Sequence, residues 1–295
     1  MTELKLRAPT ANIATRAVVE CPCCGEDQAR AQPLFEVKEH EYTTTTTDRF
    51  PLVECGGCTS WYLNPRPNES ALDIIYPPNY YAYVMDGKQE SSAPGPYQPP
   101  AKSTFYSNLA GKLFKARIKP IERHIGLSDK TRLLDIGCGS GVMLGKLQEI
   151  YGIKGVGVDL SEEAVANCKR KGFEAYCTRF EEFEPLAGTG PQELFDIVHS
   201  SHLIEHLGSP REYMLKVHSL LKPGGVCVFA TPNKATWEAG WLRGDWGGLH
   251  APRHWALLDG QSAESLCRST GFQNIEIVYS TNGIFWVWSL HSWLS

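Results

Sequence analysis

Two kinds of apolar pattern alternate along the second half of the chain. Short apolar runs of the kind found in buried strands stand in RLLDI, KGVGVDL, ELFDIVHSS and LLKPGGVCVFATPN. The segment VMLGKLQEI, which comes after the first run, has the spacing of apolar residues typical of a helix. This alternation starts near residue 104 and predicts an α/β fold with a mostly parallel sheet.

The alternation is interrupted after the run that ends in FATPN. No helix comes directly after it, and the stretch KATWEAGWLRGDWGGLHAPRHWALLDG contains four Trp, two His and two Arg. A helix is predicted over DGQSAESLCRSTGF and a further strand over QNIEIVYS, residues 273–280. We therefore interpret residues 231–258 as an insert in the sheet domain.

The first third of the chain has a different character. Residues 1–20 show little pattern and are expected to form a loose lead, whereas residues 21–85 hold paired cysteines and the aromatic run YPPNYYAYV. A hairpin is predicted over LFEVKEHEYTTTTTDRFPLVEC. Residues 86–103 are rich in Pro, Ser and Gly, as in a linker, and separate this module from a domain over residues 104–295.

Composition and charge narrow the class of protein. The 295 residues are 42% hydrophobic and 21% charged, as in a globular protein with one large core and a smaller second domain. A formal net charge of −4 argues against a broad basic surface for DNA or RNA. The sequence has no run of 18 apolar residues and no secretory signal, so a cytoplasmic location without a transmembrane segment is expected.

Four of the ten cysteines stand in two C-x-x-C pairs. Cys21 pairs with Cys24 and Cys55 with Cys58, and 30 residues separate the pairs. Two such pairs bring four thiolates together, which is the tetrahedral ligand set that Zn²⁺ favours. Free thiols or disulfides are the alternatives. Because four sulfur ligands leave no open position, we interpret the site as a structural zinc site in a module with little core of its own.

A glycine-rich turn comes after the strand predicted over RLLDI. Residues 137–141, GCGSG, let the backbone pass close to a small ligand at the carboxyl end of that strand. The dinucleotide fingerprint is excluded, because Val142 stands where its last glycine is required. The next strand ends in Asp159, an acid placed to accept both hydroxyls of a ribose, and Ser161 is predicted to cap the next helix.

These motifs resemble those of the class I S-adenosylmethionine-dependent methyltransferases. LLDIGCGSG is similar to the first motif of that family and GVDLS to the second. FDIVHSSHLIEHL resembles the fourth strand and the segment directly after it, and LLKPGGVCVFATPN the turn into the fifth strand. The resemblance covers roughly residues 105–290 and implies a Rossmann-like, mostly parallel sheet of seven strands. The cysteine module, which is N-terminal to this fold, is similar to the modules that precede the same fold in sugar C-methyltransferases.

The resemblance also implies where S-adenosylmethionine binds. Asp135 and the loop at residues 137–141 would surround the amino-acid end of the cofactor, and Asp159 would hold its ribose. Arg179 stands where the family usually has Asp, so the adenine contact is expected from Phe180 or from backbone groups. The full set of cofactor-binding residues implied in this way is Asp135, Gly137, Cys138, Gly139, Gly141, Asp159, Leu160, Phe180, Ser200 and His202.

The segment HLIEH, residues 202–206, has the H-x-x-E-H spacing of an inverted zinc-protease motif. That motif requires a long helix, in which two histidines one turn apart share a metal. Here the apolar strand FDIVHSS ends directly before His202, and GSP interrupts the pattern soon after His206. The segment therefore belongs to the carboxyl edge of the sheet, where open α/β folds bind their ligands, and not to a protease.

Three roles are open for this segment in a methyltransferase. His202 is a candidate base for the methyl acceptor, or a contact for the sulfonium end of the cofactor. HLIEH also resembles the E-x-x-E-H of metal-assisted quinone-pathway O-methyltransferases, with His202 in place of the first Glu, which implies a second divalent metal at the active site. The third alternative is that Glu205 and His206 only cap and brace the next helix.

The insert is expected to cover the substrate, because the family places its substrate cover between the fifth strand and the next helix. His250, Arg253 and His254 are candidates for holding or deprotonating an acceptor. The tryptophans of the insert are candidates for walls around an aromatic or sugar ring; these are Trp237, Trp241 and Trp246. The alternative is a packed loop whose tryptophans fill the core. The candidate catalytic residues are thus His202, Glu205, His206, His250 and His254.

The sequence predicts an enzyme that transfers a methyl group from S-adenosylmethionine to oxygen or carbon of a small molecule, of sugar type or from specialised metabolism. An RNA methyltransferase that grips its substrate with the zinc ribbon is one alternative, and the pI of about 6.2 counts against it. A non-catalytic scaffold that keeps cofactor binding is the other. The apolar run IFWVWSLHSWLS is expected in the core or in a homodimer interface.

Overall fold

The protein is described by a computed structural model that covers residues 9–42, 44–77, 80, 118–184, 194–280 and 289. The chain divides into two compact units. Unit 1 contains residues 1–80, 202–215 and 231–295, and unit 2 contains residues 81–201 and 216–230. This division differs from the linear one expected from the sequence, since the insert belongs to the unit that contains the cysteine module. The expected linker at 86–103 lies outside the described residues.

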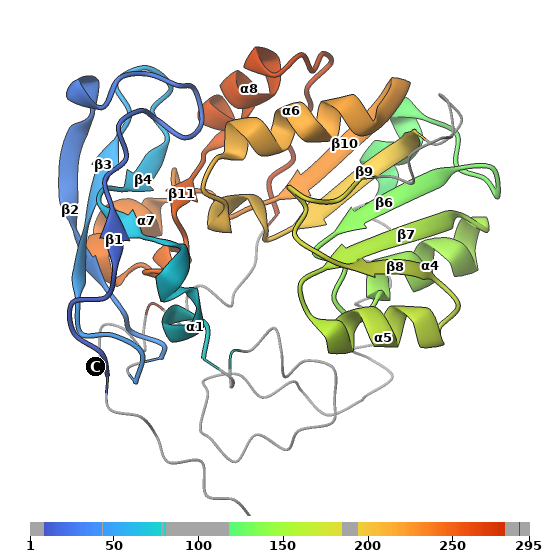
Figure 1. The fold of residues 1–295 in the computed structure, drawn as a ribbon. Helices are drawn as coiled ribbons and strands as arrows, with labels where there is room; N and C mark the ends of the chain where they lie inside the picture. The colour runs from blue at the N-terminus through green and yellow to red at the C-terminus, as the bar shows by residue number, and fades with distance from the viewer. Residues whose placement is uncertain are drawn as a thin grey trace, which may run out of the picture. The chain divides into compact units, whose positions relative to one another are not determined.

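Unit 2 is built on a parallel sheet of five strands in the order β10-β9-β6-β7-β8 (Figure 1). Its strands are β6 (Arg132–Ile136), β7 (Lys154–Asp159), β8 (Glu174–Cys177), β9 (Phe195–Ser201) and β10 (Leu221–Ala230). The apolar runs of the sequence supply β6, β7, β9 and β10. Side chains of the inner strands β6 and β9 are largely buried, as in a sheet covered on both faces, whereas those of the edge strands β8 and β10 are mostly half-buried or exposed. The predicted α/β fold is confirmed.

Two helices connect the first strands of this sheet. Helix α4 (Val142–Tyr151) comes after β6 and ends at Gly152 in the left-handed conformation, and α5 (Glu162–Arg170) comes after β7. The Ser161 side chain accepts a hydrogen bond from the Ala164 backbone N–H, and two glutamates stand in the first turn of α5. The cap predicted from the sequence is therefore confirmed, and it holds the start of α5 directly after the end of β7.

Unit 1 contains a four-stranded antiparallel sheet in the order β11-β4-β3-β2. Its strands are β2 (Gln32–Lys38), β3 (Arg49–Glu54), β4 (Trp61–Leu63) and β11 (Ala256–Leu257). The antiparallel pair β2–β3 is the predicted hairpin. Because β11 comes from the insert and pairs with β4 of the cysteine module, the two segments share one sheet. A second pair joins β1 (Thr15–Arg16) to β5 (Arg66–Pro67).

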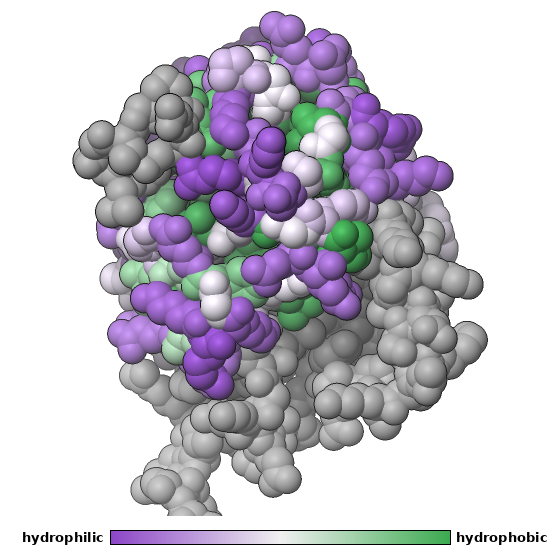
Figure 2. All heavy atoms as spheres, turned by 90° about the vertical axis from the view of Figure 1, so that its right-hand side faces the viewer, coloured by the Kyte–Doolittle hydropathy of each residue, from purple (hydrophilic) through white to green (hydrophobic). Residues whose placement is uncertain are grey.

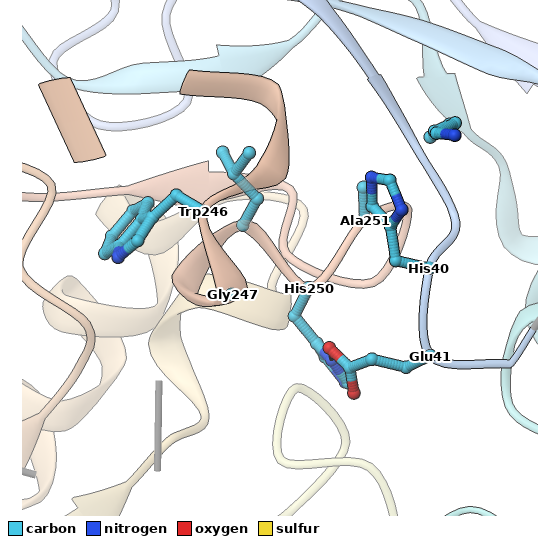
Figure 3. A pocket seen from close by; sticks show the side chains of 8 residues that line it. His40, Glu41, Trp246, Gly247, His250 and Ala251 are labelled. Atoms are coloured by element: carbon cyan, nitrogen blue, oxygen red, sulfur yellow. Dashed lines mark hydrogen bonds and ion pairs between the residues drawn. The ribbon is translucent and has the colours of Figure 1, made fainter. Parts of the chain in front are cut away.

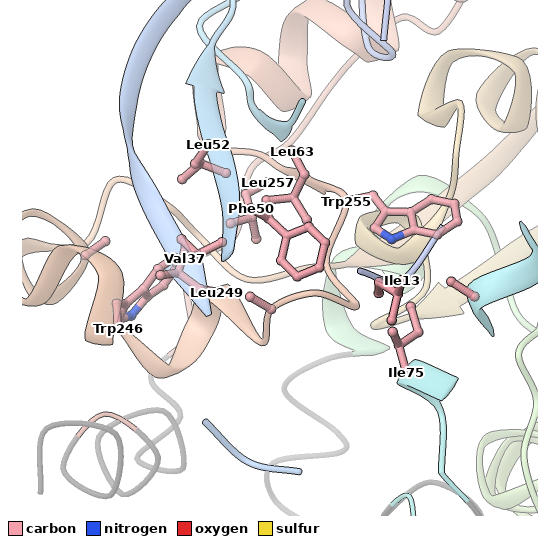
Figure 4. Packing of buried hydrophobic residues seen from close by; sticks show 13 residues of the cluster. Ile13, Val37, Phe50, Leu52, Leu63, Ile75, Trp246, Leu249, Trp255 and Leu257 are labelled. Carbon is pink, nitrogen blue, oxygen red and sulfur yellow. The ribbon is translucent and has the colours of Figure 1, made fainter. Parts of the chain in front are cut away.

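The core of unit 1 joins side chains from distant parts of the sequence. Phe50 and Leu52 of β3 pack with Trp255 and Leu257 of the insert, and Ile13 from the start of the chain lies in the same cluster (Figure 4). The helical elements of unit 1 outside α6 are η1 (Gln28–Arg30), η2 (Glu69–Ala71), α1 (Leu72–Ile75), η4 (Ile204–His206), α7 (Trp237–Leu242), η5 (Arg243–Asp245), η6 (Gly247–Leu249) and α8 (Gly260–Ser269) among the described residues. Helix α6 (Pro210–Leu220) spans the point at which the chain passes from unit 1 to unit 2.

Two local expectations differ from the structure. The segment from 9 to 20 is not a loose lead, since the Asp48 carboxylate accepts the backbone N–H groups of Asn12 and Ile13 at 2.8 and 2.7 Å and Ile13 is buried. The strand expected over residues 273–280 is not formed within the described residues, and Val278 and Tyr279 are exposed. An apolar run becomes a strand only where a neighbouring strand satisfies its backbone, which sequence alone does not reveal.

The surface of unit 2 at the right of Figure 1 faces the viewer in Figure 2. Hydrophilic residues are interspersed there with smaller hydrophobic areas. This distribution is expected where the polar positions of amphipathic helices meet water. Among the described residues, none of the helices has both the length and the apolar character needed to cross a membrane.

Candidate functional site

The glycine loop between β6 and α4 has a backbone that only glycine adopts readily. Gly137, Gly139 and Gly141 all have positive φ, at 71°, 50° and 73°. At Gly141 a side chain is also excluded by space, because its Cβ would lie 2.8 Å from the Cys168 Sγ atom. The chain therefore makes a close turn at the carboxyl end of β6, as the G-x-G-x-G pattern predicts.

Asp159 at the end of β7 is turned toward this loop. One carboxylate oxygen accepts the Gly139 backbone N–H at 2.8 Å, and the other accepts the Ser161 backbone N–H at 2.9 Å. Each carboxylate oxygen can accept more than one hydrogen bond, so these contacts fix the group and leave capacity for the hydroxyls of a ligand. The loop and the acid thus form one connected structure.

Asp135 on β6 has a partner that the sequence interpretation missed. His199 stands opposite Asp135 in the register of β6 and β9, and its Nδ1 atom lies 2.7 Å from an Asp135 carboxylate oxygen. Both residues are buried. The signal was present in the sequence, since His199 occupies a polar position in an otherwise apolar strand, but its partner depends on the strand register.

The other predicted cofactor residues differ in exposure. Cys138 and Ser200 are buried, whereas the Leu160 side chain is 70% exposed beside the end of β7. Phe180 is buried, with the Lys216 ammonium 5.4 Å from the centre of its ring. Arg179 is exposed and lies 3.7 Å from Glu181. The cofactor roles of these residues stay predictions.

His202 and Glu205 form a close pair directly after β9. The His202 Nδ1 atom lies 3.2 Å from Glu205 Oε1, and Thr231 donates its hydroxyl to Glu205 Oε2 at 3.0 Å. The His202 side chain is 41% exposed and Glu205 is fully buried. A buried carboxylate that accepts the Nδ1–H of an exposed imidazole leaves Nε2 as the ring's proton acceptor. The segment around Glu205 is the short turn η4 and not the start of a regular helix.

His206 and His254 lie beside the same carboxylate. Their ring centres are 4.6 Å apart, and the His254 Nε2 atom is 4.0 Å from Glu205 Oε1. His254 Nδ1 lies 2.9 Å from the Gly248 carbonyl, and His206 Nδ1 lies 2.8 Å from the Tyr76 hydroxyl. In both rings, therefore, Nδ1 has a protein partner. One ligand atom from each of Glu205, His206 and His254 lies within 4.8 Å of the other two.

Burial keeps these two histidine rings uncharged near neutral pH. Loss of hydration lowers the pKa of His206 to about 4, although the Glu205 carboxylate acts in the opposite direction. Loss of hydration also lowers the pKa of His254 well below its ordinary value, and the neighbouring rings of His206 and His250 add to that effect. A neutral imidazole has a lone pair to offer to a proton or a cation.

His250 is held inside unit 1 and is not placed to act as a base. Its Nδ1 atom lies 2.6 Å from Glu41 Oε1, and its Nε2 atom accepts a hydrogen bond from Arg253 Nε at 3.0 Å. Figure 3 shows the His250 and Glu41 side chains turned toward each other at a small hollow that His40 also lines. With both nitrogens engaged, His250 has no ring nitrogen left for an acceptor, so the catalytic role expected from the sequence is not supported.

Arg253 forms a fully buried ion pair with Glu39. Its two terminal nitrogens donate to the two Glu39 carboxylate oxygens at 2.6 and 2.8 Å, and one of them also donates to the Ile75 carbonyl at 2.9 Å. Burial acts to raise the pKa of Glu39, but the charge and hydrogen bonds of Arg253 outweigh it and leave that pKa below its ordinary value. Sequence reasoning missed Glu39 and Glu41, because nothing local distinguishes them from surface acids.

The four predicted metal ligands lie together in unit 1. Cys21 and Cys58 have their Sγ atoms 3.7 Å apart, those of Cys24 and Cys55 are 3.6 Å apart, and all four sulfurs lie within 4.8 Å of one another. A tetrahedron with Zn–S bonds of about 2.3 Å has sulfurs about 3.8 Å apart, so the spacing fits that ion. Backbone N–H groups point at the sulfurs, as from Gly57 to Cys55 at 3.3 Å.

The tryptophans of the insert separate into two groups. Trp246 is buried and belongs to the core of unit 1, as the packed-loop alternative expects. Trp237 and Trp241 of α7 are 65% and 69% exposed, with their rings stacked at 5.8 Å between centres. No wall around a ligand is formed by all three. The aromatic residues 81–84 and the run at 284–295 lie outside the described residues, apart from Ser289.

Comparison with known proteins places the second half of the chain in a family. Residues 105–277 match the family described as "Methyltransferase domain". A ubiquinone biosynthesis O-methyltransferase of Bradyrhizobium sp. is 32% identical over 146 residues, which are 48% of this chain and 53% of that protein. A protein of the same name from Ruegeria pomeroyi is 32% identical over 178 residues, 54% of this chain and 67% of that protein. The chain thus spans about half the length of the first of these relatives.

Solved structures also resemble this chain. The cyclopropane synthase MmaA2 from Mycobacterium tuberculosis is 21% identical to it and superposes with a TM-score of 0.43. The aligned region covers 54% of this chain and 60% of that structure.

We predict that Arg253→Met lowers the free energy of unfolding of unit 1 by about 3–5 kcal/mol, because Glu39 is left as an unpaired buried charge. All tryptophans among the described residues lie in unit 1, and we therefore follow urea denaturation of this unit by tryptophan fluorescence. Arg268→Met removes an exposed ion pair with Glu264 and serves as the control, with an expected loss under about 1 kcal/mol. Equal losses in the two variants contradict the prediction.

Proposed function

Because the chain belongs to the methyltransferase-domain family, we propose that it is an S-adenosylmethionine-dependent methyltransferase that acts on a hydroxyl group of a small molecule. The observation that carries this proposal is the connected pair of glycine loop and Asp159 in unit 2. The backbone at Gly139 leaves room for a ligand, and the Asp159 carboxylate is fixed beside it by two backbone N–H groups. A sulfonium nucleoside has the ribose hydroxyls that such an acid binds.

Methyl transfer needs little covalent chemistry from the protein. The sulfonium already carries a good leaving group, so the protein must align the acceptor oxygen in line with the methyl carbon and exclude water. A hydroxyl acceptor also has to lose its proton, which requires a base within hydrogen-bond reach. The residues directly after β9 are the ones to consider, because open α/β folds bind their ligands with the segments that come after the carboxyl ends of their strands.

His202 is the base in this proposal, and Glu205 orients it. The 3.2 Å contact to Glu205 fixes the Nδ1 side of the ring, so Nε2 takes the acceptor proton. The buried carboxylate then stabilises the imidazolium that forms. His202 is favoured over His254 and His250, because its side chain is 41% exposed whereas both others are buried.

Glu205, His206 and His254 fit a divalent cation. Each histidine has a protein partner at Nδ1, which fixes the ring as outer partners do for metal-bound histidines, and His254 Nε2 lies 4.0 Å from Glu205 Oε1. Two imidazoles and one carboxylate suit the transition metals and zinc. The third ligand is thus His254 of the insert and not His202, which contacts Glu205 instead. A bound cation would polarise the acceptor hydroxyl as a Lewis acid.

The acceptor in this proposal is a small molecule and not RNA. The Bradyrhizobium and Ruegeria relatives are O-methyltransferases of ubiquinone biosynthesis, which supports a hydroxyl acceptor. Residues 21–77, which contain the cysteine module, have four Lys and Arg against nine Asp and Glu. Such a negative segment would repel a phosphate backbone. The four-cysteine site would hold Zn²⁺ for structure alone, since four sulfur ligands leave no position for substrate.

We expect Asp159→Ala to weaken binding of S-adenosylmethionine by about 2–3 kcal/mol through the loss of charge-assisted hydrogen bonds. Titration calorimetry of the full chain with S-adenosylmethionine and with S-adenosylhomocysteine measures this loss. Asp129→Ala, which changes an exposed aspartate of the same unit, is the control and should bind as the wild type does. A wild type that binds neither compound would refute the proposed function.

Two histidine variants separate the base from the cation ligands. His202→Gln should lower kcat by about 100-fold or more, with unchanged cofactor affinity and unchanged binding of Mn²⁺ or Zn²⁺, because it removes only the proton acceptor. His254→Gln should lower both kcat and cation affinity. Measurements use a panel of hydroxylated aromatic and sugar acceptors with labelled cofactor. Full activity in His202→Gln contradicts its role as the base, and equal cation affinity in both variants contradicts the role of His254 as a ligand. Inactivity of the wild type on every acceptor favours the scaffold alternative.

Metal analysis tests the four-cysteine site. We expect one zinc ion per chain that resists dialysis, and Cys55→Ser should release it and lower the unfolding midpoint reported by tryptophan fluorescence. Cys267→Ser changes a buried cysteine of unit 1 outside the cluster and should keep the zinc. Stoichiometric zinc in Cys55→Ser would remove this cysteine from the ligand set.

A further inference from the structure

Two buried thiols lie side by side at the glycine loop of unit 2. Cys138 is the second residue of the loop and Cys168 belongs to α5, yet their Sγ atoms are only 3.7 Å apart. Neither belongs to the four-cysteine cluster of unit 1. The proposed methyl transfer uses neither thiol as a reactant. The proposed function therefore assigns no role to this pair of reactive side chains.

The pair is tied to the backbone that the cofactor is proposed to contact. The Gly139 carbonyl accepts hydrogen bonds from the thiols of Cys168, at 3.3 Å, and Cys138, at 3.6 Å. The N–H of the same residue donates to Asp159. A change at either sulfur therefore acts on Gly139 and, through it, on the acid that fixes the loop.

Packing leaves the sulfurs little space to move apart. A Cβ at Gly141 would lie 2.8 Å from Cys168 Sγ, and a Cβ at Gly157 would lie 2.7 Å from Cys138 Sγ. Glycines on both sides thus make the room in which the two thiols face each other. A disulfide bond has its sulfurs about 2.05 Å apart, so closure requires an approach of about 1.6 Å.

The surroundings of the pair lower the pKa of one of its two thiols. The hydrogen bond from Cys138 lowers the pKa of Cys168, and the positive charge of Lys171 adds to this effect against burial and the carboxylates of Asp135 and Asp159. The thiolate is the form of cysteine that reacts with peroxides. Cys168 is accordingly the attacking sulfur and Cys138 the partner that resolves the product.

We propose that Cys138 and Cys168 are a redox-sensitive pair whose oxidation to a disulfide by hydrogen peroxide weakens cofactor binding at the glycine loop. The expected loss of cofactor binding rests on the proposed function, whereas formation of the disulfide does not depend on that function. The Cys168 thiolate attacks one peroxide oxygen and breaks the O–O bond, which gives a sulfenic acid and, with one proton, water. Cys138 then attacks that sulfur and loses its own proton, and the sulfenic oxygen leaves as a second water. Two thiols and one peroxide thus give one disulfide and two waters.

The bond affects the cofactor because it forms inside the loop. Closure moves Cys138, removes both thiol donors from the Gly139 carbonyl, and ties the loop to α5. We expect the affinity for S-adenosylmethionine to fall at least tenfold. By linkage, saturating cofactor then favours the dithiol and shifts the reduction potential of the pair upward by about 30 mV for each tenfold difference in affinity.

The test uses the full chain with its metal content intact and no cofactor bound. Hydrogen peroxide is added, remaining thiols are blocked, and tryptic peptides are analysed by mass spectrometry. Cleavage after Arg132, Lys146, Lys154 and Lys169 places Cys138 in residues 133–146 and Cys168 in residues 155–169, with one cysteine in each. A linked peptide two hydrogens lighter than the sum of the two identifies the bond. Calorimetry with S-adenosylmethionine before oxidation, after oxidation and after dithiothreitol gives the affinities.

Matched variants separate this pair from the other cysteines. Cys168→Ser has its own starting affinity for the cofactor, which calorimetry measures before oxidation. That affinity should stay the same after peroxide, even if peroxide also oxidises the cysteines of unit 1. Cys177→Ser changes an exposed thiol of unit 2 and should respond to peroxide as the wild type does. Failure of the linked peptide to form, or equal affinity of the linked and reduced protein, overturns the inference. A reduced protein that binds no cofactor instead refutes the proposed function, while the linked peptide stands as a separate result.

Discussion

The buried pair of Arg253 and Glu39 is the interaction on which unit 1 depends. Both side chains are fully buried, and the two residues are 214 positions apart in the sequence. Two charges removed from water are tolerated only when each satisfies the other in good geometry, and here two N–H groups meet two carboxylate oxygens. Arg253 also holds His250, whose other nitrogen contacts Glu41. An arrangement that moved the insert away from the cysteine module would leave each of these buried charges without its partner. The pair therefore favours one arrangement of the two segments over all others.

This constraint explains which features the sequence could predict. The glycine loop, the acid at the end of β7 and the cap at Ser161 lie within about one strand–helix–strand unit. Patterns of neighbouring residues in the sequence are therefore enough to predict them. The joining of the insert to the cysteine module depends on contacts over long separations, such as β11 with β4 and Arg253 with Glu39. Glu39 and Glu41 look like surface acids in the sequence, and only the tertiary structure buries them. His254 is a candidate in the sequence as well, but its closeness to Glu205 and His206 depends on that same long-range packing.

Sulfur serves two different purposes in the two units. In unit 1 four thiols converge with the spacing of a metal tetrahedron, and each knuckle directs backbone N–H groups at its sulfurs. In unit 2 two thiols face each other beside a carbonyl of the glycine loop. The first arrangement would hold a cation among four sulfurs, and the second places one thiol 3.7 Å from another whose pKa is lowered, which is an arrangement that can oxidise to a disulfide. Spacing in the sequence revealed the first set, because C-x-x-C is a local pattern. It did not reveal the second, since that pair forms only when α5 packs on the loop.

Glu205 links the proposed acid–base chemistry to the sheet through the chain itself. His202 is the first residue after β9 and Thr231 the first after β10, and these two strands are parallel neighbours with Ser201 opposite Ala230. Both residues contact the Glu205 carboxylate, one at each oxygen. Both contacts come from residues of unit 1, so the carboxylate is fixed from two sides within that unit. In open α/β folds the segments directly after the carboxyl ends of the strands are the ones that bind ligands. A base held in this way needs no long helix, which is why a segment with the letters of a protease motif suits a different reaction here.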